Sequence, residues 1–466
     1  MTDTGLNAAA RVSTRALEYV NFVVGHSQSP QTKHQSTTRS EMMTHIEDEV
    51  CWDWTDDGSI SNIISQMRFI VRNAARINNI RSVTLRGMRT TQRLGREFCS
   101  NFDEEERIVL GLWLANVQGE APGELELPDV IAAIVSHLSS AISLEIQTFD
   151  RASHDDRGKA RPPGDPFLCT LGQLISYSNT SSVLNSLETL QLSIPIPNGD
   201  LAKDFGYCIY PESILPFFSL PSIKTLELHR VDDGGKPIKP ISLLTAPTLK
   251  RLVLKRCQLT EDNIATIIQN SPTLEVLRFD IAIDADCAKE WLNMENLQTA
   301  LAPLKESLKE LSLSLTLWSS TAIDCGGPGP WGIRGSIGSL EDFTSLVHLN
   351  ISLPVLLGWK TQGTADIIDV LPESLEVLTI TNEMSFWWKY QWDDLNREND
   401  DAEVARWETL EWKIMDFLES RPLSLKELRL EIGEVAGEEE RAKELKARLV
   451  DTGRPVGVNV TVEFET

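Results

Sequence analysis

The chain has 466 residues, 41% of them hydrophobic, and its 44 Lys+Arg against 68 Asp+Glu give a formal net charge of −24. Proteins that bind nucleic acids contact the phosphates with an excess of Lys and Arg side chains. This acidic chain lacks such an excess, so no nucleic-acid partner is expected. The longest nearly apolar run, residues 108–115, is much shorter than the roughly 18 residues that a membrane-spanning helix needs, so no membrane partner is expected.

The first 45 residues are expected to form a flexible N-terminal segment. Residues 26–40 (HSQSPQTKHQSTTRS) are polar and contain no Phe, Tyr or Trp, a composition that does not support a packed core. The chain begins without the apolar stretch that marks a secretory signal peptide. The seven cysteines are scattered without a CxxC pair, so reduced thiols and a cytoplasmic or nuclear location are predicted.

The segment that starts at Asp53 resembles the beginning of an EF-hand calcium loop. Asp53, Thr55 and Asp57 place side-chain oxygens at alternate positions, and Gly58 permits the turn that follows. The twelfth position is Ile64, where such a loop requires a bidentate glutamate. We therefore interpret the segment as an Asp-rich turn, and we predict neither a metal site nor a cofactor in this chain.

Arginine dominates the next stretch, because eight arginines and no acidic residue lie between Asp57 and Glu97. Arg68, Arg72 and Arg76 recur every four residues and would share one face of a helix. We interpret this face as solvated, or as docked against the acidic remainder of the chain. An anionic partner is the alternative.

The dominant pattern of the sequence is an internal repeat of the form L-x-x-L-x-L. Weak copies begin at Ile80 and Ala141. The eight clear copies begin at Leu187, Ile223, Leu249, Leu274, Leu308, Leu346, Leu375 and Leu425. Their spacings are 36, 26, 25, 34, 38, 29 and 50 residues. The shortest spacings are close to one leucine-rich-repeat unit, and the longer ones indicate insertions.

Strand geometry explains the repeat. Successive side chains of a strand point to opposite faces, so Leu190 and Leu192 would be buried while Gln191 faces outward. At this middle outward position, seven of the eight clear copies carry a polar residue. The pattern predicts a parallel sheet with one buried face and one open face. The predicted fold is an α/β, right-handed leucine-rich-repeat solenoid (a horseshoe) with parallel strands on its concave face.

This solenoid is predicted to occupy residues 46–466. Its parts are degenerate repeats in 46–150, clear repeats in 180–432 and a C-terminal cap in 433–466. Segments between the strands would cover the buried face; Ile264, Ile267 and Ile268 fit one face of such a helix. The cap is predicted as a helix, a turn and a closing strand.

The repeat that starts at Leu249 (LKRLVLKRCQLTEDNIATIIQNSPTLEVL) is similar to a cysteine-containing leucine-rich repeat. Cys257 lies three residues after Leu254, and Leu259 and Thr260 follow as in that consensus. Over residues 76–466 the chain resembles the divergent F-box-like leucine-rich-repeat proteins of filamentous fungi. The resemblance implies a non-catalytic protein that binds a protein partner on the concave face. It also implies a role as the substrate-recognition component of an SCF-type ubiquitin ligase, with the SCF adaptor as a partner.

A recognisable F-box is missing from the N-terminal part, because Leu6 and Leu17 are the only leucines before Leu85. The nearest candidate, residues 127–130 (LPDV), is better interpreted as the start of the helix that leads into the strand at Ala141. The alternative function is a free-standing leucine-rich-repeat interaction scaffold with no ligase role. In either case we expect a monomer.

Three neighbouring strands predict a basic spot on the open face. The candidate partner-binding residues are His229, Arg251, Lys255 and Arg278. In a parallel sheet they would be neighbours, and a basic spot on an acidic chain suits an acidic or phosphorylated peptide. Cross-strand pairing with the nearby carboxylates of Glu227 and Asp280 is the alternative.

The insertion before Leu425 is aromatic. Three further candidate partner-binding residues lie in it: Trp387, Trp388 and Trp392. A second group, which includes Trp407, Ile414 and Phe417, follows helical spacing and is interpreted as a buried stripe.

No catalytic residue is predicted. Residues 327–332 match G-x-G-x-x-G, but Pro328 and Pro330 remove amide donors that would face a pyrophosphate. The chain contains no G-x-S-x-G motif and no metal-ligand spacing among its His and Cys residues. We therefore expect that the protein is not an enzyme.

Overall fold

The clear leucine motifs form β-strands that join side by side in one sheet. In the computed structural model this sheet has 12 strands, in the order β1-β2-β3-β4-β5-β6-β7-β9-β11-β12-β13-β14. All of its pairings are parallel. The strands are β1 (Glu49–Asp53), β2 (Ser82–Met88), β3 (Ser143–Thr148), β4 (Thr189–Ser193), β5 (Thr225–His229), β6 (Arg251–Cys257), β7 (Val276–Asp284), β9 (Glu310–Trp318), β11 (His348–Ser352), β12 (Val377–Thr381), β13 (Glu427–Ile432) and β14 (Asn459–Phe464). A separate parallel pair joins β8 (Leu292–Asn293) and β10 (Ile333–Arg334).

The structure describes residues 49–53, 60–73, 80–88, 102–110, 127–148, 166–177, 184–194, 208–234, 236–238, 246–284, 292–318, 333–358, 365–382, 411–420, 424–432 and 439–464. The helices are α2 (Ile60–Arg72), α5 (Leu127–Ser136), α6 (Pro166–Tyr177), α7 (Pro211–Ile214), η5 (Leu215–Ser219), α8 (Glu261–Gln269), α9 (Met294–Leu301), η6 (Ala302–Leu304), α10 (Leu353–Leu357), α11 (Ile367–Val370) and α14 (Glu439–Val456). Residues 104–110 and 411–419 are also helical. No helix within these ranges combines the length and the apolar composition needed to cross a membrane.

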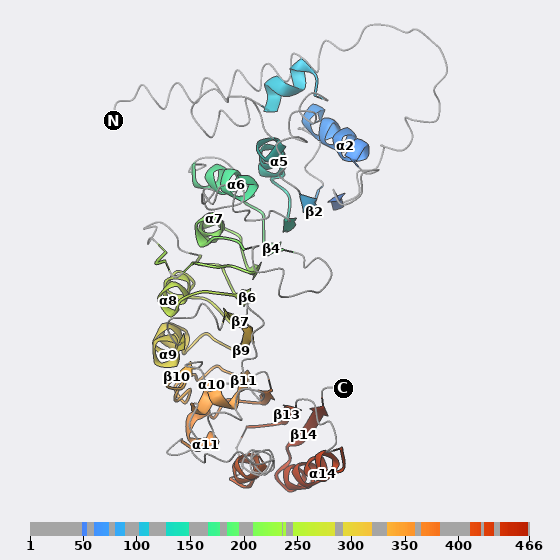
Figure 1. The fold of residues 1–466 in the computed structure, drawn as a ribbon. Helices are drawn as coiled ribbons and strands as arrows, with labels where there is room; N and C mark the ends of the chain where they lie inside the picture. The colour runs from blue at the N-terminus through green and yellow to red at the C-terminus, as the bar shows by residue number, and fades with distance from the viewer. Residues whose placement is uncertain are drawn as a thin grey trace.

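The helices and the strands form two layers that follow a curve. Figure 1 shows α5, α6, α8 and α9 along the outer side of this curve and the strands along its inner side. The expected α/β class and the expected parallel strands are confirmed. The sheet does not close on itself, since β1 and β14 each pair with one strand only among the described residues.

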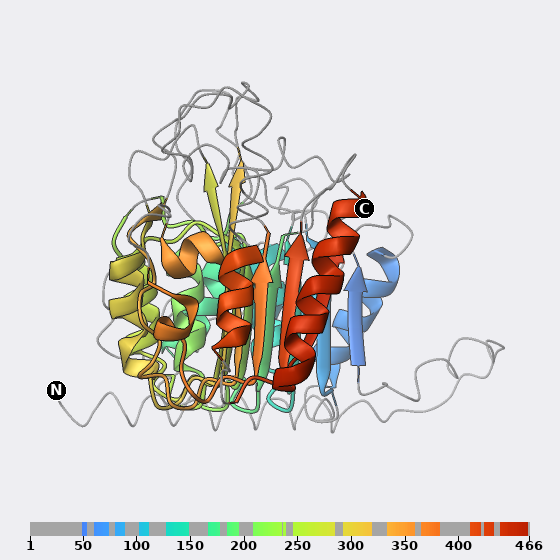
Figure 2. The ribbon, with the colours of Figure 1, turned by 90° about the horizontal axis from the view of Figure 1, so that it is seen from below.

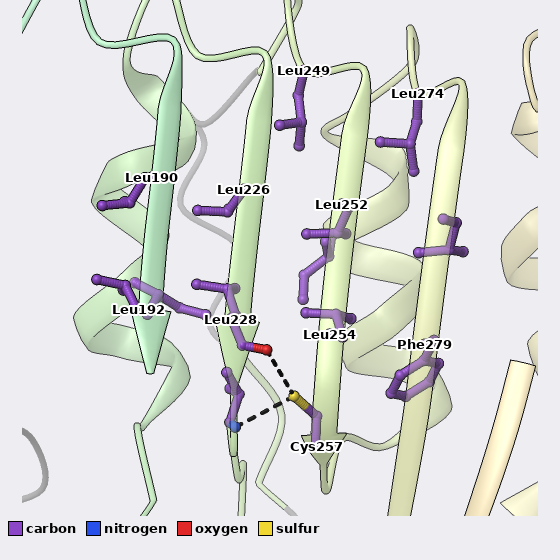
Figure 3. Packing of buried hydrophobic residues seen from close by; sticks show 14 of the residues in the cluster. Leu190, Leu192, Leu226, Leu228, Leu249, Leu252, Leu254, Cys257, Leu274 and Phe279 are labelled. Atoms are coloured by element: carbon purple, nitrogen blue, oxygen red, sulfur yellow. Dashed lines mark hydrogen bonds between the residues drawn. The ribbon is translucent and has the colours of Figure 1, made fainter. Parts of the chain in front are cut away.

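The buried face of the sheet carries rows of leucines that run from strand to strand. Leu190 is fully buried, and the register pairs it with Leu226, which in turn pairs with Leu252. Figure 3 shows these side chains and those of Leu192 and Leu228 on the same side of the sheet. The alternation predicted from the sequence is therefore confirmed.

The helix α8 illustrates how the second layer forms. Ile264, Ile267 and Ile268 are buried, as their spacing predicts. Acidic residues occupy the first turn, where they interact favourably with the helix dipole. The helix ends at Gln269, and Pro272 follows shortly after and cannot continue it.

The hydroxyls of Thr248 and Thr273, each at the start of a repeat, tie it to the preceding one, a feature that the leucine pattern does not predict. All eight clear copies carry Ser or Thr immediately before the first residue of the motif. Thr248 donates to the carbonyl oxygens of Pro221 (3.2 Å) and Ile223 (2.9 Å). Thr273 donates in the same way to Pro247 (2.8 Å) and Leu249 (3.1 Å).

Cys257 ties the end of its repeat to the preceding one. Its Sγ accepts a hydrogen bond from the Val231 N–H (3.4 Å) and donates to the Leu228 carbonyl (3.7 Å), as Figure 3 shows. The thiol is completely buried, and burial raises its pKa to about 12. Arg256, at φ 52°, is an extra residue that interrupts the register between β6 and β7, so that Cys257 reaches the core.

The N-terminal and C-terminal parts extend the sheet. The weak copies form β2 and β3, and the helix and the strand predicted at the C-terminal end are α14 and β14, drawn in red in Figure 2, which confirms the predicted secondary structure of these segments. The strand β1 was not predicted; Val50 and Trp52 are its buried side chains. The helix α5 begins at Leu127, which confirms the helical interpretation of this segment.

Candidate functional site

The open face of the sheet carries rows of polar side chains in register. The middle row runs through Gln191, Glu227, Val253, Arg278, Ser312, Asn350, Thr379 and Arg429. Seven of these eight side chains are half-buried or exposed, whereas Val253 is buried. Because neighbouring parallel strands lie about 4.8 Å apart, such rows present closely spaced groups to the solvent.

The charged centre of this face is Glu227 on β5. Its Oε1 accepts hydrogen bonds from Lys255 Nζ (2.6 Å) and from His229 Nε2 (2.9 Å). Burial by itself would raise the pKa of Glu227, but these two hydrogen bonds outweigh it, and the pKa lies below its ordinary value. For His229, burial is the largest influence and lowers the pKa, while the bond to Glu227 opposes the shift.

A second ion pair lies two strands further along the sheet. Arg278 on β7 donates from Nε to the Glu310 carboxylate on β9. Asp280, the other carboxylate considered from the sequence, instead accepts from the Arg256 backbone N–H at 3.2 Å. Among the described residues no ion pair or hydrogen bond holds the Arg251 guanidinium, so its charge remains available to a partner.

The structure thus brings the four basic candidates onto one face, where three of them pair with carboxylates of neighbouring residues. His229 and Lys255 share Glu227, and Arg278 pairs with Glu310. The result is a patch of mixed charge around the apolar Val253. We call the residues Glu227, His229, Arg251, Val253, Lys255, Arg278 and Glu310 the mixed-charge patch.

The mixed-charge patch suits recognition of another protein. The side chains of Lys255 and Arg278 are each about half exposed. They can therefore release the carboxylates of Glu227 and Glu310 and bind carboxylates of a partner instead. Ion pairs at exposed positions contribute little to stability, and their rearrangement is correspondingly inexpensive. A buried apolar side chain within a ring of charged groups resembles the centre and rim of a protein interface.

The remaining candidates have different outcomes. Trp387, Trp388 and Trp392 lie outside the described residues, as do residues 327–332 with their G-x-G-x-x-G motif. In the calcium-loop-like segment, α2 begins at Ile60, so that Ile64, its twelfth position, lies within the helix. Within the described ranges, no group of three or more His, Cys, Asp or Glu side chains is arranged to hold a metal ion.

The arginine-rich stretch is docked on the chain itself at two positions. Arg68 Nε contacts Glu106 at 2.8 Å, and Arg72 Nε contacts the same carboxylate at 2.6 Å. Asp103 accepts from both guanidinium groups as well. Glu106 is buried, so these two arginines compensate a buried charge, in agreement with the interpretation of a docked face.

Sequence reasoning missed Glu310 as a member of the mixed-charge patch. Its position is the first outward residue of its repeat, and the register places it opposite Val276. Aligning the repeat that begins at Leu308 with the three repeats before it would have found it.

A scan against protein-family models matches no family, and a search of curated proteins finds no significant match.

Proposed function

We propose that this protein binds a protein partner through the open face of its sheet and performs no catalysis. The observation that carries the proposal is the open face itself: its rows of polar side chains remain half-buried or exposed, while helices cover the other face. The mixed-charge patch at β5, β6, β7 and β9 is the proposed centre of the interface.

In its more specific form, the proposal is that the fold is a right-handed leucine-rich-repeat horseshoe that acts as a monomer. The strand order, the leucine rows and the inner position of the strands support this assignment. The helix, turn and strand at the C-terminal end have the arrangement expected of a solenoid cap. We propose that the protein acts in the cytoplasm or the nucleus.

The resemblance to F-box-like leucine-rich-repeat proteins supports a role as the substrate-recognition component of an SCF-type ubiquitin ligase. Cys257 is the residue that best supports the resemblance itself, because its thiol makes the contacts to the preceding repeat described above. The second candidate is a free-standing interaction scaffold, favoured by the lack of a leucine-rich segment before Leu85.

The test is affinity purification of the tagged full-length chain from its native cells, followed by mass spectrometry. Co-purification of the SCF adaptor and a cullin supports the ligase role. A stable partner without these two proteins supports the scaffold. Recovery of no specific protein partner would contradict the proposed binding function.

A matched pair of variants then tests the face. The first carries Arg251→Glu, Lys255→Glu and Arg278→Glu; the control carries the same change of charge at Lys305, Lys426 and Lys443, which lie outside the patch. We expect the patch variant to bind the recovered partner at least about tenfold more weakly, because like charges then face the partner. Equal losses in both variants would show that net charge, and not the patch, controls binding.

A further inference from the structure

A groove lies along the edge of the sheet where the strands begin. It has a volume of about 500 Å³. Its lining residues are Lys224, Pro247, Thr248, Lys250, Pro272, Thr273, Glu275, Glu306, Ser307 and Lys309. These residues precede β5, β6, β7 and β9, so the groove crosses the starts of four strands. We call it the edge groove.

Backbone hydrogen bonds fix the spacing of the charged residues along this edge. The N–H of Lys250 donates to the Lys224 carbonyl (2.9 Å), that of Glu275 to Lys250 (2.8 Å) and that of Lys309 to Glu275 (2.7 Å). Consecutive side chains therefore stand about 4.8 Å apart, and the four positions span about 14 Å. A single small anion does not fill this length, whereas about four residues of extended peptide do.

The order of charges along the edge contains one step between like charges. Lys224 forms an ion pair at 2.7 Å with Glu188, which belongs to the preceding repeat. Lys250 forms an ion pair at 2.6 Å with Glu275, which belongs to the following repeat. Lys309 holds Glu275 from its other side at 2.8 Å. The two adjacent lysines, Lys224 and Lys250, thus turn away from each other, and no described carboxylate bridges them.

Glu275 shows what a carboxylate gains at this edge. Hydrogen bonds from Lys250 and Lys309 are the largest influences on it and lower its pKa to about 2. A second carboxylate placed above Lys224 and Lys250 would draw their ammonium groups away from Glu188 and Glu275, with which they pair at exposed positions. Exposed ion pairs contribute little to stability, so this exchange is possible at the one like-charge step among the described residues of the groove.

The floor of the groove contains a hydroxyl without a partner. The hydroxyls of Thr248 and Thr273 donate hydrogen bonds to carbonyl groups of the preceding repeats. Ser307 occupies the same position of its repeat, but its buried Oγ makes no hydrogen bond within the part of the chain that the structure describes. Buried polar atoms in proteins are normally paired, and a rotation of the Ser307 side chain would turn this oxygen toward a ligand group in the groove.

We propose that the edge groove binds an extended, acidic peptide segment of a protein partner. One of its carboxylates lies between Lys224 and Lys250, and its backbone runs along the groove past Ser307. This site lies at the starts of the strands, apart from the mixed-charge patch, so its existence does not depend on the proposed function of the open face.

The test is fluorescence anisotropy with the full-length chain and three labelled hexapeptides that differ at two positions, which are glutamate, phosphoserine or glutamine. The comparison uses Lys224→Gln/Lys250→Gln, with Lys305→Gln/Lys426→Gln as the control that removes two charges outside the like-charge step. Thermal melting checks that each variant is folded. We expect the glutamate peptide to bind the wild-type chain and the control equally, and the groove variant at least about tenfold more weakly.

Other outcomes overturn the proposal. These are equal binding of the glutamine peptide, unchanged binding by the groove variant, or no binding of the glutamate peptide at low salt. Binding of the phosphoserine peptide alone would replace the acidic segment with a phosphorylated one. Ser307→Ala is expected to weaken glutamate-peptide binding several-fold without changing the melting temperature, and unchanged binding would remove this hydroxyl from the site.

Discussion

At the scale of single residues, Cys257 joins two repeats through an atom that makes weak hydrogen bonds. Its value lies in filling a fully buried position while meeting the Val231 N–H and the Leu228 carbonyl. Leucine would be too large here, and a charged group would be costly to bury. The structure thus gives a packing reason for a cysteine at this place in a repeat.

Replacing this residue tests its contribution. We expect Cys257→Ala to lower the free energy of unfolding by about 1–2 kcal/mol, because it leaves a small cavity and an unpaired N–H. The matched change Cys51→Ala, at an exposed position of β1, should cost less than about 0.5 kcal/mol. Urea denaturation measures both values, and equal losses would contradict a special role for the buried thiol.

Two histidines make the stability depend on pH. Burial lowers the pKa of His137 and of His229 below the ordinary value of 6.5, while Lys255 and Arg256 further lower that of His229 and Glu227 opposes them. Below pH 6.5 the unfolded chain binds these protons more readily than the folded chain, so stability decreases as the pH falls. The lowered pKa of Glu227 continues the trend below pH 4.5.

The measurement is chemical denaturation at pH 7.5, 6.5 and 5.5. We expect the free energy of unfolding to fall across this series in the wild-type chain. In the His137→Gln/His229→Gln variant the fall should be smaller, because fewer groups take up protons on unfolding. The same fall in both proteins would show that other groups control the response.

At the scale of elements, the hydroxyls of Thr248 and Thr273 each join a repeat to the preceding one. We expect Thr273→Val to lower the free energy of unfolding by about 1–2 kcal/mol, since the carbonyls of Pro247 and Leu249 lose this donor. Ser307→Ala is the matched control at the same position of the next repeat. Its hydroxyl has no partner among the described residues, so the change should stay within about 0.5 kcal/mol. Thermal or urea unfolding distinguishes the two, and a larger loss for Ser307→Ala would contradict this account.

The strands follow from the sequence wherever leucines alternate with polar residues. From Thr189 onward this period of two identifies each repeat strand of the sheet, because only a strand buries every second side chain. The leucine pattern does not identify strand β1, because its buried side chains are Val50 and Trp52. The Ser or Thr before each leucine motif is visible in the sequence. Its hydrogen bonds cannot be predicted from the sequence, because the acceptors belong to the preceding repeat in space.

The candidate site was predictable only in part. The sequence places His229, Lys255 and Arg278 on adjoining strands, and the register confirms this neighbourhood. Which carboxylate each cation meets depends on side-chain conformations and on the next strand in the sheet. Glu310 lies 32 residues from Arg278 along the chain, so its pairing with that arginine emerges only once the strands are aligned.

At the scale of the whole molecule, stability depends on covering the last repeat. The C-terminal helix and strand, which we propose to be a cap, place buried Leu445 and Leu449 of α14 and buried Val460 and Val462 of β14 at the end of the sheet. Each such side chain contributes about 1.5–3 kcal/mol by burial. Removing residues 433–466 would expose the edge of β13 together with the apolar surface that these side chains cover.

We expect the chain that ends at Ile432 to unfold at a lower temperature than the full chain and to associate more strongly than the full chain at the same concentration. Light scattering coupled to size-exclusion chromatography measures the association, and calorimetry measures the unfolding temperature. A truncated chain that is monomeric and as stable as the full chain would contradict the proposed role of the cap.

The order of the strands also bears on synthesis. Among the described residues, each strand of the 12-stranded sheet pairs only with the strands that precede and follow it within this sheet along the chain, from β1 to β14. Each strand after β1 that leaves the ribosome therefore finds the strand it pairs with already made. The nascent protein can thus fold in the direction of its own translation, and each new repeat covers the one before it.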